Sequence, residues 1–315
     1  MGSGAQRMIS LANPRAAVAC GPSLRTLLAG IQPYLLLLPA IGFVFSITIY
    51  PIANLFYIAF HSTNYFEIGD WNGGGNFAPL FSASGAKSFL ASATFVFASD
   101  VLTLSLALLL AVTMEAPLRG RGLLRTLIMV PWLVSQVVTA LLWQALLDAN
   151  FGPLTHFVQS VFGWTVAPLS DETGAMVAMI LANVWRSYPF ALVLILAAIQ
   201  SIPSELYEAA RIDGASRWAE FRCITLPMIA RTIAVVLILL TFEYFTLVTL
   251  PFILTSGGPN EATYVLSLRI WREAFTDYHF GYSAATGVVV FLLNLALSIF
   301  YIRHFVLREA SHVSR

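Results

Sequence analysis

The sequence predicts an all-α integral membrane protein with six transmembrane helices. Of the 315 residues, 58% are hydrophobic and only 10% are charged, whereas soluble domains carry about 25% charged residues. The mean hydropathy is +0.78, and about six spans of roughly 25 residues account for the length. This composition excludes an ordinary soluble enzyme and a disordered chain, and a net charge of +1 argues against nucleic acid as a partner.

Six stretches are long and apolar enough to cross about 30 Å of hydrocarbon at about 1.5 Å per residue. They are Tyr34–Phe60, Phe89–Met114, Leu123–Leu147, Met176–Ile199, Met228–Leu254 and Tyr282–Val306. Four of them contain proline, at Pro39, Pro51, Pro131, Pro189 and Pro251. Membrane helices tolerate such residues where a neighbouring helix or a cavity satisfies the freed backbone groups.

The basic residues predict the orientation of the chain. Thirteen of the 17 fall on one side of the six spans: Arg7, Arg15, Arg25, Arg119, Arg121, Arg125, Arg211, Arg217, Arg222, Arg231, Arg303, Arg308 and Arg315. Only Lys87, Arg269 and Arg272 fall on the other side, and Arg186 lies within a span. Cytoplasmic loops are rich in Lys and Arg, so we expect a multi-pass protein of the cell membrane with both termini in the cytoplasm.

We expect one transmembrane domain, residues 34–307, between a cytoplasmic N-terminal tail (1–33) and a short cytoplasmic C-terminal tail (308–315). The small residues before Cys20 weakly resemble a lipoprotein cleavage site, but Pro14 and Arg15 interrupt the apolar run, so no cleaved signal peptide is expected. Cys20 and Cys223 are too few for a disulfide framework, and both fall on the predicted reducing side.

The segment between the fourth and fifth spans reads as two short amphipathic helices. Ser204 is placed to cap the first helix, Gly214 to end it in a left-handed turn, and Ser216 to cap the second. The second helix carries apolar residues at every third position, Trp218, Phe221 and Ile224. Two interpretations stay open on amphipathicity alone: a helix pair lying in the lipid headgroups, or a docking surface for a cytoplasmic partner.

The residues of this segment resemble a known family. Glu208-Ala-Ala-Arg-Ile-Asp-Gly-Ala215, followed by Phe221 and Ile224-Thr-Leu-Pro227, is similar to the EAA loop of ABC importer permeases. The resemblance implies the type I ABC importer permease fold, with residues 200–227 (the 200–227 loop) coupled to an ATP-binding subunit. It assigns the coupling role to Glu208, Ala209, Ala210, Asp213, Gly214, Ala215, Phe221, Leu226 and Pro227.

Further segments resemble the carbohydrate-type permeases of that family. They are Gly120–Arg125 with Val130–Trp132, Ala198–Pro203, Leu254–Pro259 and Arg272–Phe275. The resemblance implies import of a sugar, an oligosaccharide or a polyol phosphate by alternating access. It also implies four partners: a second permease subunit, two ATP-binding subunits, and an external or periplasmic substrate-binding protein that docks on loops including Gly257–Pro259. We expect the two permease subunits to form a heterodimer, and a pore of two copies of this chain stays open as the alternative.

The sequence shows no nucleotide site of its own. Lys87, the single lysine, stands in Gly85-Ala-Lys-Ser88, which lacks the glycines of a phosphate-binding loop. The resemblance therefore implies that ATP and Mg²⁺ bind to partner subunits and that this chain carries no cofactor. The five histidines show no metal-ligand spacing, and no catalytic set is evident. We therefore expect neither a metal site nor an enzyme.

Three charged residues lie deep in the predicted spans, where a charge costs about 2.5–3.5 kcal/mol: Asp100, Arg186 and Glu243. They form part of a polar pathway, or Arg186 pairs with Asp100 or Glu243 for structural reasons. Two alternative functions stay open, an ion-coupled secondary transporter that uses Asp100 and Glu243, and a membrane scaffold that recruits a partner.

The substrate path is predicted by resemblance alone. Trp185–Phe190 is similar to the stretch from which maltose-type permeases contact sugar, which points to Ser187 and Phe190. In the fifth span the sequence departs from the family, because Thr246 and Thr249 replace the usual amide and acid. The candidate path residues are Ser187, Phe190, Glu243, Tyr244 and Thr246.

Overall fold

The computed structural model describes residues 37–115, 121–163 and 167–307, so both predicted tails lie outside the described residues. The chain divides into two units, residues 1–53 and 54–315. In the first unit, residues 37–53 are helical and include the π-helix η1 (Phe45–Ile49) and the start of α2 (Tyr50–Ala59). The π turn comes directly before Pro51, and the Tyr50 N–H donates to the Phe45 carbonyl, five residues back.

The second unit begins with the last residues of α2, which are followed by an antiparallel hairpin and then by helices. The hairpin consists of β1 (His61–Asn64) and β2 (Glu67–Trp71), and a 3₁₀ helix, η2 (Gly75–Phe81), follows. The first helices are α3 (Ala83–Glu115), α4 (Arg121–Leu133), α5 (Gln136–Leu146), α6 (Pro153–Phe162) and α7 (Glu172–Gln200). The next are α8 (Ser204–Ile212), α9 (Arg217–Glu220), the π-helix η3 (Phe221–Thr225) and α10 (Leu226–Met228). The last are α11 (Ala230–Thr246), α12 (Thr249–Leu254), α13 (Leu266–Phe275), α14 (Phe280–Tyr301) and the π-helix η4 (Ile302–Leu307).

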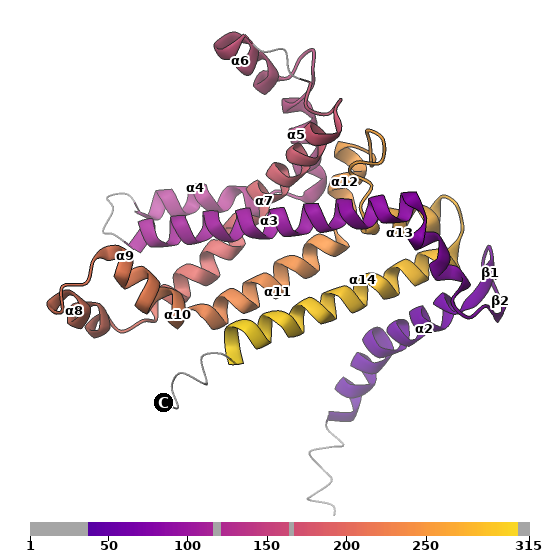
Figure 1. Ribbon diagram of the computed structural model, residues 1–315, viewed down its shortest axis with the longest axis horizontal. Coiled ribbons are helices and arrows are strands. Elements are labelled where there is room, and N and C mark those ends of the chain that lie inside the picture. Colours follow the sequence, from indigo (N-terminus) through magenta and orange to yellow (C-terminus); the bar gives the residue numbers. More distant parts are fainter. Residues whose placement is uncertain (1–36, 116–120, 164–166, 308–315) are drawn as a thin grey trace, which may run out of the picture. The chain divides into compact units, whose positions relative to one another are not determined.

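The core of the second unit lies between its long helices. The helix α7 packs along α3, with α4 and α11 also against it, and α11 packs on α14. Buried apolar side chains from these helices, including Phe95, Met179, Ile195 and Leu240, form one cluster. Figure 1 shows α8, α9 and α10 at one end of the second unit and α12, α13 and the hairpin at the opposite end.

Among the described residues, four helices are long and apolar enough to cross a membrane: Leu37–Ala59, Ala83–Met114, Glu172–Gln200 and Phe280–Phe305. Two bent pairs raise the number to six if each is one span, Gly122–Leu133 with Gln136–Leu146 (95°) and Arg217–Met228 with Ala230–Thr246 (66°). The structure thus accommodates the six predicted spans, and two of them, Leu123–Leu147 and Met228–Leu254, both of which contain a proline, are not continuous helices.

The break between α11 and α12, at Leu247, has an identifiable cause and is distinct from the 66° bend before α11. Pro251 has no N–H, so the carbonyl of Leu247, four residues earlier, receives no helical hydrogen bond. The chain leaves helical geometry at Leu247, where ψ is 107°, and α12 begins two residues later. The buried hydroxyl of Ser267 donates to the Leu247 carbonyl at 2.7 Å. A side chain of α13 thus replaces the missing backbone donor, and the break carries no unsatisfied carbonyl at that position.

Candidate functional site

The 200–227 loop folds as the sequence predicts in outline. The helix α8 is followed by a turn, then by α9, η3 and α10, which lead into α11. Ser216 caps α9, accepting from the Ala219 N–H at 3.3 Å. The prediction that Ser204 caps α8 is wrong, because the N-cap is Pro203 and Ser204 is the first helical residue.

Gly214 ends α8 in a left-handed turn, as expected, with φ of +80°. The Ala215 N–H donates to the Ala210 carbonyl at 2.9 Å, and the Gly214 N–H donates to the Arg211 carbonyl at 3.1 Å. These two bonds make a Schellman motif, which satisfies the last carbonyls of the helix. An added Cβ at Gly214 would meet no atom within 4 Å. The backbone conformation, and not the space available, therefore favours glycine here.

The predicted coupling residues lie on one compact loop. Glu208, Ala209, Asp213, Gly214 and Pro227 are exposed, whereas Ala210, Ala215, Phe221 and Leu226 are half-buried. The ring of Trp218, which is 68% exposed, stacks on Phe221 with centroids 5.6 Å apart. The loop thus presents three carboxylates (Glu205, Glu208 and Asp213), small residues and one large aromatic ring to its surroundings.

Two side-chain contacts within the loop were not predicted. Arg211 on α8 makes a bidentate ion pair with Glu220 on α9, at 2.8 Å from Nε to Oε1 and 3.3 Å from Nη2 to Oε2. The hydroxyls of Tyr207 on α8 and Thr225 in η3 share a buried hydrogen bond of 2.9 Å. The four-residue spacing of Tyr207 and Arg211, which places both on one face of a helix, was the signal available.

The three intramembrane charges do not form one group. Arg186 of α7 donates to Glu243 of α11 at 2.8 Å, which confirms one of the two pairings considered from the sequence. The Arg186 side chain is 17% exposed and that of Glu243 is 36% exposed. Asp100 of α3 instead accepts from the hydroxyl of Thr241 at 2.7 Å. Asp100 is therefore held by a neutral partner, and the ion pair lies between α7 and α11.

Hydroxyl groups extend the polar cluster around Asp100. Thr241 also shares a hydrogen bond with the Tyr301 hydroxyl at 3.2 Å, which links α11 to α14. One turn further along α11, the Tyr244 hydroxyl bonds that of Thr103 on α3 at 3.1 Å. These contacts join α3, α11 and α14 by polar bonds inside an otherwise apolar core.

The five candidate path residues differ in accessibility. Ser187 and Tyr244 are buried, and Phe190 is half-buried with its ring 6.0 Å from that of Trp132. Thr246 is exposed, and its hydroxyl donates to the carbonyls of Phe242 and Glu243 in its own helix. The structure thus brings only Glu243 and Thr246 to the surface of α11 together.

Several buried polar atoms beside this region have no hydrogen-bond partner among the described residues. They are Ser99 Oγ and Asp100 Oδ1 on α3, and Asn183 Nδ2 and Arg186 Nε on α7. An unsatisfied buried polar group costs about 1–3 kcal/mol. The paired helices α3 and α7 therefore carry polar groups that their packing alone does not explain.

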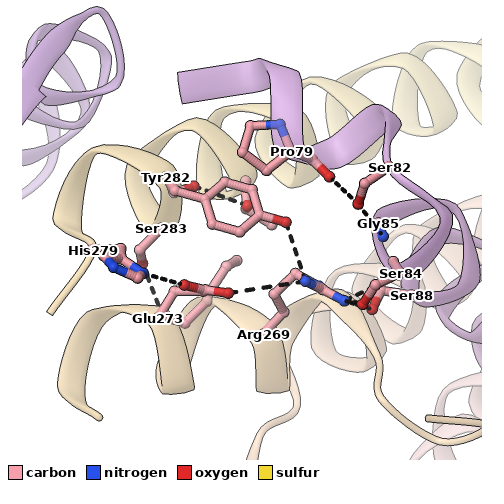
Figure 2. A network of polar contacts seen from close by, with 12 residues as sticks. Pro79, Ser82, Ser84, Gly85, Ser88, Arg269, Glu273, His279, Tyr282 and Ser283 are labelled. Carbon is pink, nitrogen blue, oxygen red and sulfur yellow. Dashed lines mark hydrogen bonds and ion pairs between the residues drawn. The ribbon is translucent and has the colours of Figure 1, made fainter. Parts of the chain in front are cut away.

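At the opposite end of the unit, Arg269 of α13 is the centre of a polar network (Figure 2). It is only 5% exposed, and its guanidinium donates to the hydroxyls of Ser84 and Ser88 on α3 and of Tyr282 on α14. The guanidinium also lies 4.7 Å from the centre of the Tyr264 ring. One side chain thus fastens α13 to the first turns of two spans.

The loop from Thr255 to Thr263, which contains the predicted docking segment Gly257–Pro259, is closed by its own hydroxyls. Thr263 donates to the Gly258 carbonyl at 2.8 Å and bonds the Thr255 hydroxyl at 2.7 Å. Gly257 has φ of +88°, and an added Cβ would lie 2.6 Å from the Tyr264 ring. Glycine is therefore required there for both conformation and space.

The comparisons with known proteins agree with this arrangement. Residues 103–304 match the family described as "Binding-protein-dependent transport system inner membrane component". The trehalose/maltose transport system permease protein MalF of Thermococcus litoralis is 33% identical over 280 residues, covering 86% of this chain and 92% of that protein. The sn-glycerol-3-phosphate transport system permease protein UgpA of Yersinia enterocolitica is 34% identical over 279 residues, covering 86% and 92%.

A solved structure shows the same fold. A chain of a bacterial ABC transporter involved in the import of the acidic polysaccharide alginate superposes with a TM-score of 0.76 at 26% sequence identity, covering 88% of this chain and 97% of that one. The six-span permease fold implied by the resemblance is therefore confirmed. The chain belongs to the family of binding-protein-dependent transport system inner membrane components, the multi-pass permease subunits of ABC importers.

Proposed function

We propose that this chain is the permease subunit through which an ABC importer moves a carbohydrate, that is a sugar, an oligosaccharide or a polyol phosphate, into the cell. The relatives with 33% and 34% identity are named for trehalose/maltose and for sn-glycerol-3-phosphate, and the similar structure comes from an alginate importer. These names support the carbohydrate class and give no support to the ion-coupled alternative.

One structural relationship carries the proposal: the 200–227 loop joins the same two helices that hold the intramembrane ion pair. The loop leaves α7 after Gln200 and enters α11 through α10. Arg186 lies 14 residues before Gln200, about 21 Å along the helix axis, and it pairs with Glu243 of α11. A displacement of the loop would therefore act directly on the helices that bear the polar pair.

In this mechanism the ATP chemistry belongs to two partner subunits, one of which seats α8 in a surface cleft. Glu208 and Asp213 are exposed on α8 and its cap, and a carboxylate on such a surface pairs well with a partner's arginine or lysine. A loaded binding protein docks on the opposite end, which includes Gly257–Pro259. The closing of the ATP-bound subunits turns the spans outward, and hydrolysis returns them inward. The 200–227 loop and both termini then face the cytoplasm.

A second permease subunit completes the pathway. One face of α11 exposes Val235, Leu239, Phe242 and Thr246, residues three or four apart that form a continuous stripe. Glu243 borders this stripe and is one-third exposed. This supports an arrangement in which α11 faces the partner permease and the pair Arg186–Glu243 offers hydrogen bonds to hydroxyl groups of the solute.

The test is reconstitution of the chain with its co-purified partners in proteoliposomes. We expect an ATP-binding protein to co-purify, solute uptake to require ATP, and Glu208→Ala or Gly214→Asp to lower uptake while ATP hydrolysis continues. Glu205→Gln, a change of another exposed carboxylate on α8, is the matched control. Uptake that continues without any ATPase and stops when the proton gradient is dissipated would overturn the proposal. A complex that assembles normally and moves no solute would favour a scaffold.

A further inference from the structure

The 200–227 loop is closed on itself by two pairs of side chains, which we call the loop clip: Arg211 with Glu220, and Tyr207 with Thr225. Tyr207 and Arg211 are one turn apart on α8. Glu220 and Thr225 are five residues apart, which in an α-helix places them about 140° from one another. The π turn η3 holds Thr225 nearer to the face of Glu220. The π turn thus lets both residues reach the same side of α8.

The loop clip connects two helices that are joined by a short turn of the backbone. Between α8 and α9 the chain consists only of Asp213–Ser216, with Gly214 in the left-handed conformation. Glycine has more accessible backbone conformations than any other residue, so this turn is the natural place for the two helices to change their angle. Side-chain contacts across the turn therefore decide whether α8 and α9 move as one body.

The burial of Glu220 makes the ion pair obligatory. The Glu220 side chain is 9% exposed, whereas that of Arg211 is 57% exposed. A buried carboxylate without hydrogen bonds is costly, so turning Arg211 toward another protein would take from Glu220 its two hydrogen bonds to the guanidinium. Its two parallel bonds to Glu220 also fix the orientation of the guanidinium plane. Arg211 is exposed, as are Glu208 and Asp213, but its guanidinium is bonded to another side chain of the loop.

We propose that Tyr207, Arg211, Glu220 and Thr225 are positioning residues for transport: they hold α8 at a fixed angle to α9 and η3. A displacement imposed on α8 is then delivered through α10 to α11 and is not absorbed at Gly214. This inference rests on the proposed function, in which a partner moves α8. It assigns to the arginine of the Glu208–Ala215 segment an internal role in place of a contact with the partner.

The first experiment measures the hinge itself and needs no partner. Spin labels are placed at Glu205→Cys and Arg222→Cys in a full-length chain in which Cys20 and Cys223 are replaced by serine. With the clip intact we expect one narrow distance distribution, which broadens in Glu220→Gln and in Tyr207→Phe. A distribution that stays narrow in both variants would overturn the clip, whatever the partner does.

The second experiment measures coupling in the reconstituted importer. We expect Glu220→Gln to raise the ATP hydrolysed per solute imported by about tenfold, the change in an equilibrium that loss of one charge-assisted bond produces. The amount of co-purified ATPase stays unchanged. Glu205→Gln and Arg222→Gln, which alter exposed charges of the same loop, leave the ratio unchanged. A Glu220→Gln ratio equal to that of the parent chain would overturn the proposal.

Charge reversal separates a role within the loop from a role at the partner. Arg211→Glu alone raises the ratio, and the double variant Arg211→Glu with Glu220→Arg lowers it again because the pair is restored in the opposite sense. If Arg211 contacted the partner instead, the double variant would hydrolyse as much ATP per solute imported as the single variant does. That result would overturn the proposal. If the parent chain retains no ATPase at all, the proposed function fails, while the spin-label result still reports on the clip.

Discussion

The guanidinium of Arg186 donates to the carboxylate of Glu243 across 2.8 Å, from the middle of α7 to the last turns of α11. Both residues lie within helices that cross the apolar part of the protein, so each charge depends on the other.

Glu243→Gln leaves Arg186 without its counter-charge, and we expect a loss of stability of about 1–3 kcal/mol, less than for a fully buried pair because Glu243 is partly exposed. Thermal unfolding in detergent, followed by tryptophan fluorescence, measures it. In the double variant Arg186→Gln with Glu243→Gln no charge is left unpaired, so we expect its stability to recover. If the pair contacts the solute, uptake stays low in this variant. Recovery of both would show that the pair is structural only.

Asp100→Asn is expected to support uptake at or near the parental rate. The asparagine keeps an oxygen that accepts from Thr241, whose hydroxyl now lies 2.7 Å from the carboxylate, and it removes the ionisable group. Uptake into reconstituted proteoliposomes, with ATP supplied on the side of the 200–227 loop and with a protonophore added, is the measurement. An intact complex that loses uptake in this variant would revive ion coupling through Asp100.

Arg269→Lys is expected to destabilise the protein more than Arg272→Lys does. Lysine lacks the planar fork that serves Ser84, Ser88 and Tyr282 together, and each buried group left unsatisfied costs about 1–3 kcal/mol. Arg272 is half-buried, and its side chain donates to the Ser256 carbonyl at 2.8 Å and lies 5.3 Å from the centre of the Tyr264 ring, so its replacement removes fewer contacts and is the milder control. Equal melting temperatures for the two variants would contradict the claim that the hydrogen bonds of Arg269 contribute more to stability than the contacts of Arg272.

Gly214→Ala is expected to loosen the 200–227 loop by about 1–2 kcal/mol, the cost of a left-handed conformation for a residue with a Cβ. Gly214→Asn costs less, because asparagine tolerates that conformation. Hydrogen–deuterium exchange of residues 204–225 is the measurement. Gly122→Ala is the control, since an added Cβ there also meets no atom within 4 Å but its φ is not positive. The same protection in Gly214→Ala and the parent chain would contradict the strain argument.

The ion pair of the 200–227 loop has a defined pH dependence. The hydrogen bond from Arg211 holds the pKa of Glu220 below its ordinary value of 4.5, against the opposing effect of desolvation. A lowered pKa in the folded state means that the pair stabilises the loop fully above about pH 4.5. That stabilisation is lost only as the pH falls through the lower folded pKa. Carboxyl ¹³C shifts of Glu220 check this, and Arg211→Gln should raise the pKa; an unchanged midpoint would contradict it.

The sequence was sufficient to predict the class of fold, the 200–227 loop and the approximate ends of most helices, because membrane spans and capped turns are encoded locally. Met176–Ile199 was predicted for the span that runs over Glu172–Gln200, and Gly214 stands where its turn requires it. Such features need only the residues within one or two turns of the chain.

The effect of each proline was not predictable in the same way. Pro189 lies inside α7, which continues to Gln200, whereas the chain leaves helical geometry four residues before Pro251. In the second case the freed carbonyl of Leu247 meets Ser267, which is 20 residues further on. A contact of that kind depends on tertiary packing, and so do the pairings of Arg186 with Glu243 and of Arg211 with Glu220. The sequence offered candidates for the first pairing and none for the second.

The bend between α4 and α5 has a consequence for how this part of the chain is held in the bilayer. The two helices have 13 and 11 residues, about 20 and 16 Å, so neither reaches across about 30 Å of hydrocarbon alone. Both pack on α7. Because each half is too short to cross alone, the contacts of α4 and α5 with α7 help to hold this bent span in the apolar part of the bilayer.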